Sequence, residues 1–180
     1  MNIKNYEFKA RVTDLEKYES KLLTLNPQFH GIDNQTDTYF NVPKGRLKLR
    51  EGNIENSLIN YNRENVADSK LSDIILFKHE PDNALKKILE IQFGIKVIVN
   101  KRRKIYFINN VKFHFDIVET LGTFIEVEVI DNNNNFTLEQ LKEQCDSFFN
   151  FFELNKSDLI DKSYSDMIAE KNILQNVDLS

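Results

Sequence analysis

Long charged side chains of both signs recur at every second position in several segments with strand-like alternation. Residues two apart on a β-strand point to the same face, so these side chains share one face of each strand. The opposite face of the same segments is rich in Leu, Ile, Val and Phe. The charged residues in this pattern are Glu7, Lys9 and Arg11, then Arg46, Lys48 and Arg50, then Lys101 and Arg103, then Glu126 and Glu128.

These residue types together suit a polyanion and a divalent metal. Lysine and arginine neutralise phosphate oxygens, and arginine can do so with two parallel hydrogen bonds. Carboxylates are the ligands that Mg²⁺ and Mn²⁺ prefer. Glu126 and Glu128 lie on one strand face, about 7 Å apart along the strand, and Glu7 can converge on them from another strand. On chemistry alone this set suits a polyanion bound together with a divalent metal and does not specify a reaction.

Two architectures produce strands with one charged and one apolar face. In an open sheet, helices cover the apolar face and the charges look out at solvent. In a closed barrel, the charged face lines the lumen and the helices pack outside. The pattern alone leaves both open. The solvated sheet is the simpler of the two, because burying an unpaired charge costs several kcal/mol.

The elements that must position these residues can be read along the chain. We expect a first helix after a capping-box pattern at Thr13 and Glu16, a second that ends at Gly94, and a third that begins at Thr137 with Gln140 completing its capping box. A short helix is expected near Ser163–Asp166, followed by a polar tail. The expected strands cover residues 3–12, 35–42, 46–50, 58–63 and 73–78, with two or three more between 96 and 130.

Composition excludes several classes of protein. The chain has 180 residues and a net charge of −4, which fits one domain with its own core and argues against a general nucleic-acid coat protein. Cys145 is the single cysteine, so neither an internal disulfide nor a cysteine-rich zinc site is possible. No apolar run is long enough to cross a bilayer, and the first residues lack the apolar stretch of a signal peptide. We therefore expect a cytoplasmic protein with no membrane partner and no specific nucleic-acid partner.

A few remaining residue types are common in functional sites, but we expect structural roles for them here. The three histidines, His30, His79 and His114, are scattered and form no metal-binding spacing. Tyr164 is expected to pack rather than to act in catalysis. The phenylalanines between 148 and 152 cover more than one helix face, so some can pack outside a barrel or form a homodimer contact.

Several segments, taken in order, resemble the CYTH superfamily of triphosphate tunnel metalloenzymes. That family includes class IV adenylyl cyclases and thiamine triphosphatases. Seven segments between about residues 3 and 168 carry the resemblance. They are Tyr6–Val12, Gln35–Phe40, Gly45–Glu51, Leu58–Arg63, Lys101–Tyr106, His114–Glu128 and Ser163–Asp166.

The resemblance implies an α+β fold built on a closed eight-stranded antiparallel β tunnel with a charged lumen and helices outside. One domain would span residues 1–170, with a polar tail at 171–180. Glu7, Glu126 and Glu128 would bind Mg²⁺ or Mn²⁺, and Asp116 and Glu119 could add to this acidic set. The cations implied to grip the triphosphate are Lys9, Lys48, Arg50, Arg63, Lys101 and Arg103, with Arg11 and Arg46 as second choices. The catalytic set would be Glu7, Lys9, Arg63, Lys101 and Arg103.

The first motif departs from the family pattern Glu-x-Glu-x-Lys, because Asn5 stands where the first Glu would be. This puts a full set of ligands for two metals in doubt and tilts against the inorganic triphosphatase branch. The resemblance favours a class IV-type adenylyl cyclase that converts ATP to cyclic AMP and pyrophosphate. A nucleoside or thiamine triphosphatase, and a weakly catalytic module that binds a nucleotide or polyphosphate, are the alternatives.

Overall fold

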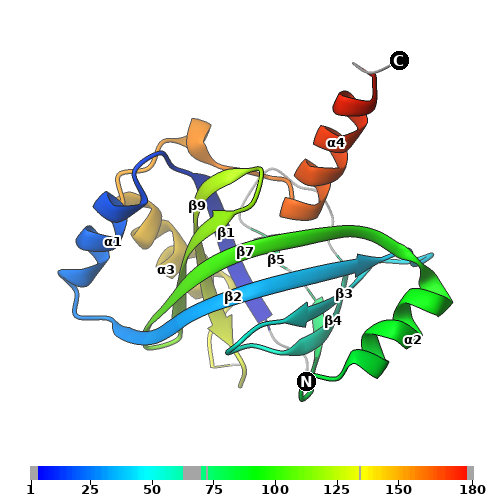
Figure 1. The fold of residues 1–180 in the computed structure, drawn as a ribbon. Coiled ribbons are helices and arrows are strands. Elements are labelled where there is room, and N and C mark those ends of the chain that lie inside the picture. The colour runs from blue at the N-terminus through cyan, green and yellow to red at the C-terminus, as the bar shows by residue number, and fades with distance from the viewer. Residues whose placement is uncertain (1–3, 63–69, 72, 134, 178–180) are drawn as a thin grey trace.

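The computed structural model shows one strongly curled antiparallel sheet with helices around its outside (Figure 1). It describes residues 4–62, 70–71, 73–133 and 135–177. The strands are β1 (Lys4–Arg11), β2 (Gln28–Phe40), β3 (Arg46–Glu51), β4 (Ser57–Asn62), β5 (Lys70–Leu71), β6 (Asp73–Lys78), β7 (Ile95–Ile108), β8 (Val111–Val118) and β9 (Gly122–Asp131). The helices are α1 (Leu15–Leu23), α2 (Asn83–Phe93), α3 (Leu138–Phe151), the short 3₁₀ helix η1 (Lys156–Asp158) and α4 (Tyr164–Val177).

The sheet is open, with nine strands in the order β5-β1-β9-β8-β7-β2-β3-β4-β6. The α+β class and the predicted eight antiparallel strands are confirmed, with the two-residue β5 as an additional short strand in the described part of the chain, but the prediction that the barrel is closed is wrong. Closure would need a hydrogen-bonded ladder between β1 and β6. These strands lie near each other, but β1 pairs with the two-residue β5 and β6 pairs with β4. The two edges of the curled sheet are therefore formed by consecutive strands, β5 and β6.

Strand register places the charged residues of neighbouring strands side by side. In the β1–β9 ladder, Glu7 lies opposite Glu128 and Lys9 lies opposite Glu126. In the β7–β8 ladder, Arg103 lies opposite Asp116. Because the side-chain period of a strand is two, this register brings all of these residues to the same face of the sheet.

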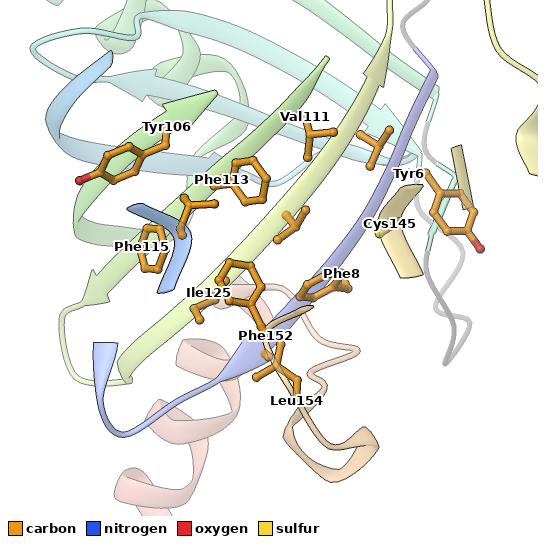
Figure 2. Packing of buried hydrophobic residues seen from close by; sticks show 14 of the residues in the cluster. Tyr6, Phe8, Tyr106, Val111, Phe113, Phe115, Ile125, Cys145, Phe152 and Leu154 are labelled. Atoms are coloured by element: carbon orange, nitrogen blue, oxygen red, sulfur yellow. The ribbon is translucent and has the colours of Figure 1, made fainter. Parts of the chain in front are cut away.

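The apolar face of β1, β8 and β9 packs under helices and forms the main core (Figure 2). Phe8 of β1, Phe113 and Phe115 of β8 and Ile125 of β9 are buried there. Phe152, which caps the end of α3, inserts between the rings of Phe113 and Phe115 and contacts both in edge-to-face geometry. This packing confirms the predicted apolar faces. The phenylalanines at 148, 149 and 151 are partly buried and pack against the same core, so they help to cover the outer face of the sheet.

The helix boundaries follow local capping signals. The capping box of α3 forms as predicted, with Thr137 accepting from Gln140 N–H at 3.2 Å and the Gln140 side chain accepting from Thr137 N–H at 2.8 Å. The predicted capping box of α1 is wrong. Asp14 directly precedes the first helical residue, and its carboxylate accepts from Lys17 N–H at 3.0 Å. Gly94 ends α2 with a φ of 67°, a conformation that glycine adopts without strain.

The C-terminal helix is longer than the sequence suggested. α4 runs to Val177, so the polar stretch after Lys171 continues this helix instead of forming a separate tail. The first turn of α4 is buried against the sheet at Tyr164 and Ser165, and the helix then projects away from the sheet (Figure 1). Among the described residues, none of the helices combines the length and apolar character needed to cross a bilayer.

Candidate functional site

The concave side of the sheet holds a cavity of about 1020 Å³. Its charged lining comes from strands that are far apart in the sequence. The charged residues are Glu7, Lys9, Asp37, Lys48, Arg50, Glu55, Lys101, Arg103, Lys112, Glu126 and Glu128, with Lys78 and Glu80 near the β6 edge. The charged strand faces therefore surround a shared cavity and are not spread over an outer surface. The structure is therefore neither of the two architectures that the pattern left open, because the sheet is open and its charged face nevertheless surrounds a cavity.

Asp37 of β2 gathers three cations on one side of the cavity. Its carboxylate accepts from Arg50 at 2.9 and 3.1 Å and from Lys101 at 2.7 Å, and it contacts Lys48 at 3.2 Å. Asp37 is only 2% exposed. Burial raises the pKa of its carboxyl, but the charges of these three cations more than offset burial and hold the pKa well below its usual range. Asp37 is therefore ionised and fixes the three basic side chains.

The same cluster carries more positive than negative charge. Burial, together with the neighbouring Arg50, Arg103 and Lys48, lowers the pKa of Lys101 to about 7, although Asp37 pulls it upward. Lys101 is thus a cation that a further anion would stabilise. An anion that entered the cavity beside it would meet unneutralised positive charge.

Arg103 of β7 links a buried acid to the cavity wall. Its guanidinium binds Asp116 with two hydrogen bonds of 2.7 and 2.6 Å and donates to Glu126 at 2.7 Å. Tyr164 of α4 donates its hydroxyl to Asp116 at 2.8 Å. Lys9 approaches the other oxygen of Glu126 at 3.1 Å and lies 4.3 Å from the centre of the Tyr164 ring. Asp116 lies behind Arg103, where it orients the guanidinium, and it does not line the cavity.

The carboxylates of Glu7, Glu126 and Glu128 line the neighbouring wall, and His114 of β8 is buried beside the last two. The His114 Nδ1 atom lies 3.3 Å from Glu126 and 3.7 Å from Glu128. One ligand atom from each of these three residues lies within 4.8 Å of the other two. Burial and the nearby charges of Arg103 and Lys112 lower the pKa of His114 to about 3, so its imidazole is neutral at physiological pH.

The charge balance of this wall fits a divalent cation. Burial, together with the negative charges of Glu126 and Glu7, raises the pKa of Glu128 to about 7 against the opposing effect of Lys112. Like charges directly opposite each other on paired strands repel, and a bound cation would relieve that repulsion. The oxygen donors of Glu7, Glu126 and Glu128 match the ligands of Mg²⁺ or Mn²⁺.

A third charged cluster comes from the loop between β3 and β4. Glu55 accepts from Arg50 at 3.0 Å and from Gln35 at 3.1 Å, and it binds Lys112 of β8. Two backbone N–H groups of this loop, those of Ile54 and Glu55, donate to the buried Asp33 at 2.9 and 3.0 Å. Asp33 therefore holds the loop so that the Glu55 carboxylate faces the cavity.

The structure brings eight of the predicted site residues together and places four others, among them Asp116, away from the cavity lining. The eight that line the cavity are Glu7, Lys9, Lys48, Arg50, Lys101, Arg103, Glu126 and Glu128. Arg11 is exposed beside Phe124 and donates to the Leu121 carbonyl at 2.5 Å. Arg11 occupies the last position of β1, so its side chain lies beyond the cavity.

Three further predicted residues also lie away from the cavity wall or outside the described chain. Arg46 lines a separate cavity of about 260 Å³ and binds Ser163 at 2.6 Å and Asp166 at 2.8 Å. Glu119 lies in an exposed turn, where it accepts from Asn100 at 2.9 Å. Arg63 lies outside the described residues.

Sequence reasoning missed several residues of this site. Asp37 stands between Thr36 and Thr38, so no alternation of long charges marks it. Glu55 sits in a loop, where periodicity gives no signal. Lys112 and His114 alternate with Asp116 on β8, and extending the period-two pattern backwards from Asp116 would have found both. The structure places His114 beside Glu126 and Glu128, a closeness that the scattered sequence positions of the three histidines did not indicate.

Comparisons with known proteins agree with this geometry. The family model described as "CYTH domain" matches residues 4–164. The chain is 23% identical over 176 residues to "Adenylate cyclase CyaB" of Aeromonas hydrophila, covering 94% of this chain and 91% of that protein. It is similar to the solved structure of the PH1012 protein from Pyrococcus horikoshii, with a TM-score of 0.77, 28% identity, and coverage of 90% and 98% of the two chains.

A more distant solved structure shares the fold. It is described as HpAC1, a putative adenylyl cyclase from Hippeastrum with a dominant triphosphatase activity. Its TM-score is 0.64, its identity is 12%, and the match covers 96% of each chain. At that identity the likeness extends to the fold alone.

Proposed function

Because the chain belongs to the CYTH domain family, we propose that it is a metal-dependent enzyme that converts ATP to cyclic AMP and pyrophosphate. The observation that carries the proposal is the pairing, within one cavity, of a wall of basic side chains with a wall of three carboxylates. A solvated sheet face has no need of such convergence, because exposed charges are stable in water on their own. The adenylate cyclase relative from Aeromonas hydrophila supports the choice of cyclase.

The basic wall would bind the triphosphate. Lys48 and Arg50 come from β3, Lys101 and Arg103 from β7, and Lys9 from β1. Their present acidic partners hold them in place before substrate binds, so little side-chain entropy remains to be lost on binding. Phosphate oxygens would share these cations with Asp37 and Glu126. Fixed positive charge of this kind stabilises the negative charge that develops on a transferring phosphoryl group.

The carboxylate wall would hold the metal ion through Glu7, Glu126 and Glu128. A divalent ion bound there supplies Lewis-acid stabilisation of phosphate oxygens. The contribution of the chain itself is to fix these carboxylates on two paired strands, β1 and β9, whose register sets Glu7 opposite Glu128. Lys9 and Arg103 both contact Glu126, so they would position metal and phosphate relative to each other.

An apolar part of the cavity lining supports a nucleotide over inorganic triphosphate. Ile59 of β4 and Ile74 and Leu76 of β6 line the cavity together with the rings of Tyr39 and Tyr61. Ligand sites commonly combine such apolar surface with a few polar anchors, and a volume of about 1020 Å³ is at the upper end of their usual range. In the proposed reaction, the ribose 3′-hydroxyl attacks the α-phosphorus, the bond from that phosphorus to the bridging oxygen breaks, and pyrophosphate leaves.

Hydrolysis of a triphosphate is the second candidate. The observation that favours it is the dominant triphosphatase activity described for the Hippeastrum neighbour. The same basic and acidic walls would serve, with water as the nucleophile in place of the ribose hydroxyl. The two candidates differ in which phosphorus atom lies beside Glu126 and Glu128.

A substrate panel separates these candidates. Purified protein is incubated with ATP, thiamine triphosphate or inorganic tripolyphosphate, each with MgCl₂ or MnCl₂, and phosphate and pyrophosphate are measured separately. The proposal expects pyrophosphate from ATP and slow or no turnover of tripolyphosphate. Phosphate release from tripolyphosphate or thiamine triphosphate at a higher rate than pyrophosphate release from ATP would move the assignment to hydrolysis. For any variant run in this panel, the matched control is Asp146→Asn, a substitution at a half-exposed position of α3.

A further inference from the structure

His114 is fully buried and turns one ring nitrogen toward the carboxylate wall. Its Nδ1 atom lies within hydrogen-bond distance of Glu126 at 3.3 Å and lies 3.7 Å from Glu128. Its Nε2 atom has no hydrogen-bond partner in the described part of the chain. Nδ1 is therefore the nitrogen through which the ring meets this wall.

His114 is close enough to both carboxylates for the three side chains to reach one ion after small adjustments. Metal–ligand bonds of roughly 2.0–2.2 Å place neighbouring donor atoms about 3 Å apart and opposite ones about 4.3 Å apart. The Nδ1 atom of His114 and one oxygen each of Glu126 and Glu128 all lie within 4.8 Å of one another. β8 and β9 fix this arrangement, because His114 and Glu126 are directly paired in their ladder.

We propose that His114 donates a nitrogen ligand to the divalent metal held by Glu126 and Glu128, and that this ligand makes the site favour Mn²⁺ or Co²⁺ over Mg²⁺. The inference rests on the proposed function, which places a metal at this wall. Mg²⁺ takes oxygen ligands almost alone, whereas imidazole nitrogen is a ligand of first-row transition metals. Affinity for a mixed nitrogen–oxygen set rises from Mn²⁺ to Co²⁺ in that series. Carboxylates alone would give a weaker preference for these ions, because imidazole suits transition metals and not Mg²⁺.

The direct test is pulsed electron paramagnetic resonance on the intact wild-type protein loaded with Mn²⁺. Coordination by His114 predicts a ¹⁴N coupling of the size of a directly bound imidazole. His114→Gln removes this coupling. His79→Gln, the same change at a histidine elsewhere in the cavity lining, leaves it intact. Since the wild-type spectrum alone answers the question, the test does not depend on the stability of the variant.

Calorimetric titration with MnCl₂ or MgCl₂ alone tests the selectivity. His114→Gln should weaken Mn²⁺ binding by about tenfold or more and Mg²⁺ binding by less than about threefold. Equal losses for both ions would overturn the proposal and assign His114 a structural role. So would Mn²⁺ binding that Glu128→Gln abolishes but that shows no nitrogen coupling; in that case the proposed function would stand. A wild-type protein that binds neither ion, with or without ATP, would overturn both.

Discussion

Replacing Asp37 with asparagine removes the carboxylate that Arg50, Lys101 and Lys48 all contact, and the first two of these cations are buried. The substitution keeps the size of the side chain and one hydrogen-bond acceptor, so it creates no cavity. What it changes is charge, because Arg50, Lys101 and Lys48 all contact the Asp37 carboxylate within 3.2 Å. The side chains of Lys101 and Asp37 are 1% and 2% exposed, so water cannot replace the lost carboxylate.

The expected cost follows from that burial. Removing one partner of a buried ion pair typically destabilises a protein by about 3–5 kcal/mol, because it leaves an uncompensated charge in the interior. We expect Asp37→Asn to lose about 3 kcal/mol of unfolding free energy, at the lower end because Lys101 can shed its proton. The sign of the pH dependence is fixed as well. Because the folded pKa of Asp37 is lowered, its contribution is full above its unfolded value of about 4 and is lost as pH falls further.

Urea unfolding at neutral pH measures this cost, with Asp146→Asn as the matched control. Asp146 forms an exposed ion pair with Lys142 one helical turn away, and both side chains are half exposed. Its loss should cost no more than about 0.5 kcal/mol. Tripolyphosphate should raise the midpoint of Asp37→Asn more than that of the wild type, because phosphate oxygens supply the missing negative charge. A loss below about 1 kcal/mol for Asp37→Asn, or no extra stabilisation by tripolyphosphate, would refute the idea that Asp37 organises an anion site.

Three further predictions test other parts of the site. Glu126→Gln should abolish metal-dependent turnover, because Glu126 contacts Lys9, Arg103 and the proposed metal. Unchanged turnover would contradict the metal assignment. Circular dichroism of the variant checks that the fold persists. Arg50→Ala should weaken tripolyphosphate binding by about tenfold or more, on the scale of about 1.5–3 kcal/mol for a hydrogen bond to a charged group; an unchanged calorimetric affinity would place Arg50 outside the binding path. Triphosphate binding at about pH 8 should take up a proton, because the pKa of Lys101 is lowered to about 7 in the free protein and an added anion raises it. Calorimetry in buffers of different ionisation enthalpy measures that uptake, and Lys101→Arg, which stays protonated, should abolish it; equal uptake by both proteins would assign the proton elsewhere.

The strand faces could be predicted from sequence because burial on one side and charge on the other leave a period-two pattern. Lys9 and Glu126 illustrate this, since apolar residues of the opposite face flank each of them on the strand. The extent of β2 could not be predicted. Its first half, Gln28–Asn34, is polar and largely exposed, and it becomes a strand by pairing with β7. Closure of the sheet could not be predicted from the period-two pattern for a related reason. It depends on which long-range ladder forms at the edge, and the short β5 takes the place beside β1.

The candidate site could be predicted where charged residues repeat along a strand, and not where a single residue pairs with charges from other segments. Asp37 and Glu55 neutralise basic residues from other strands, so their roles depend on contacts between segments 13 to 64 residues apart or, for Glu55, on a loop conformation. Arg46 shows the opposite error. It shares the strand face of Lys48 and Arg50, but it lies at the end of β3, where Ser163 and Asp166 at the start of α4 bind it.

The measurement that tests the central claim most directly is the chromatographic separation of products after incubation of the purified protein with ATP and MnCl₂ or MgCl₂. The account predicts cyclic AMP and pyrophosphate in equal amounts, dependent on the metal and absent in Glu128→Gln. ADP and phosphate as the main products, or ATP that remains intact with either metal, would contradict it.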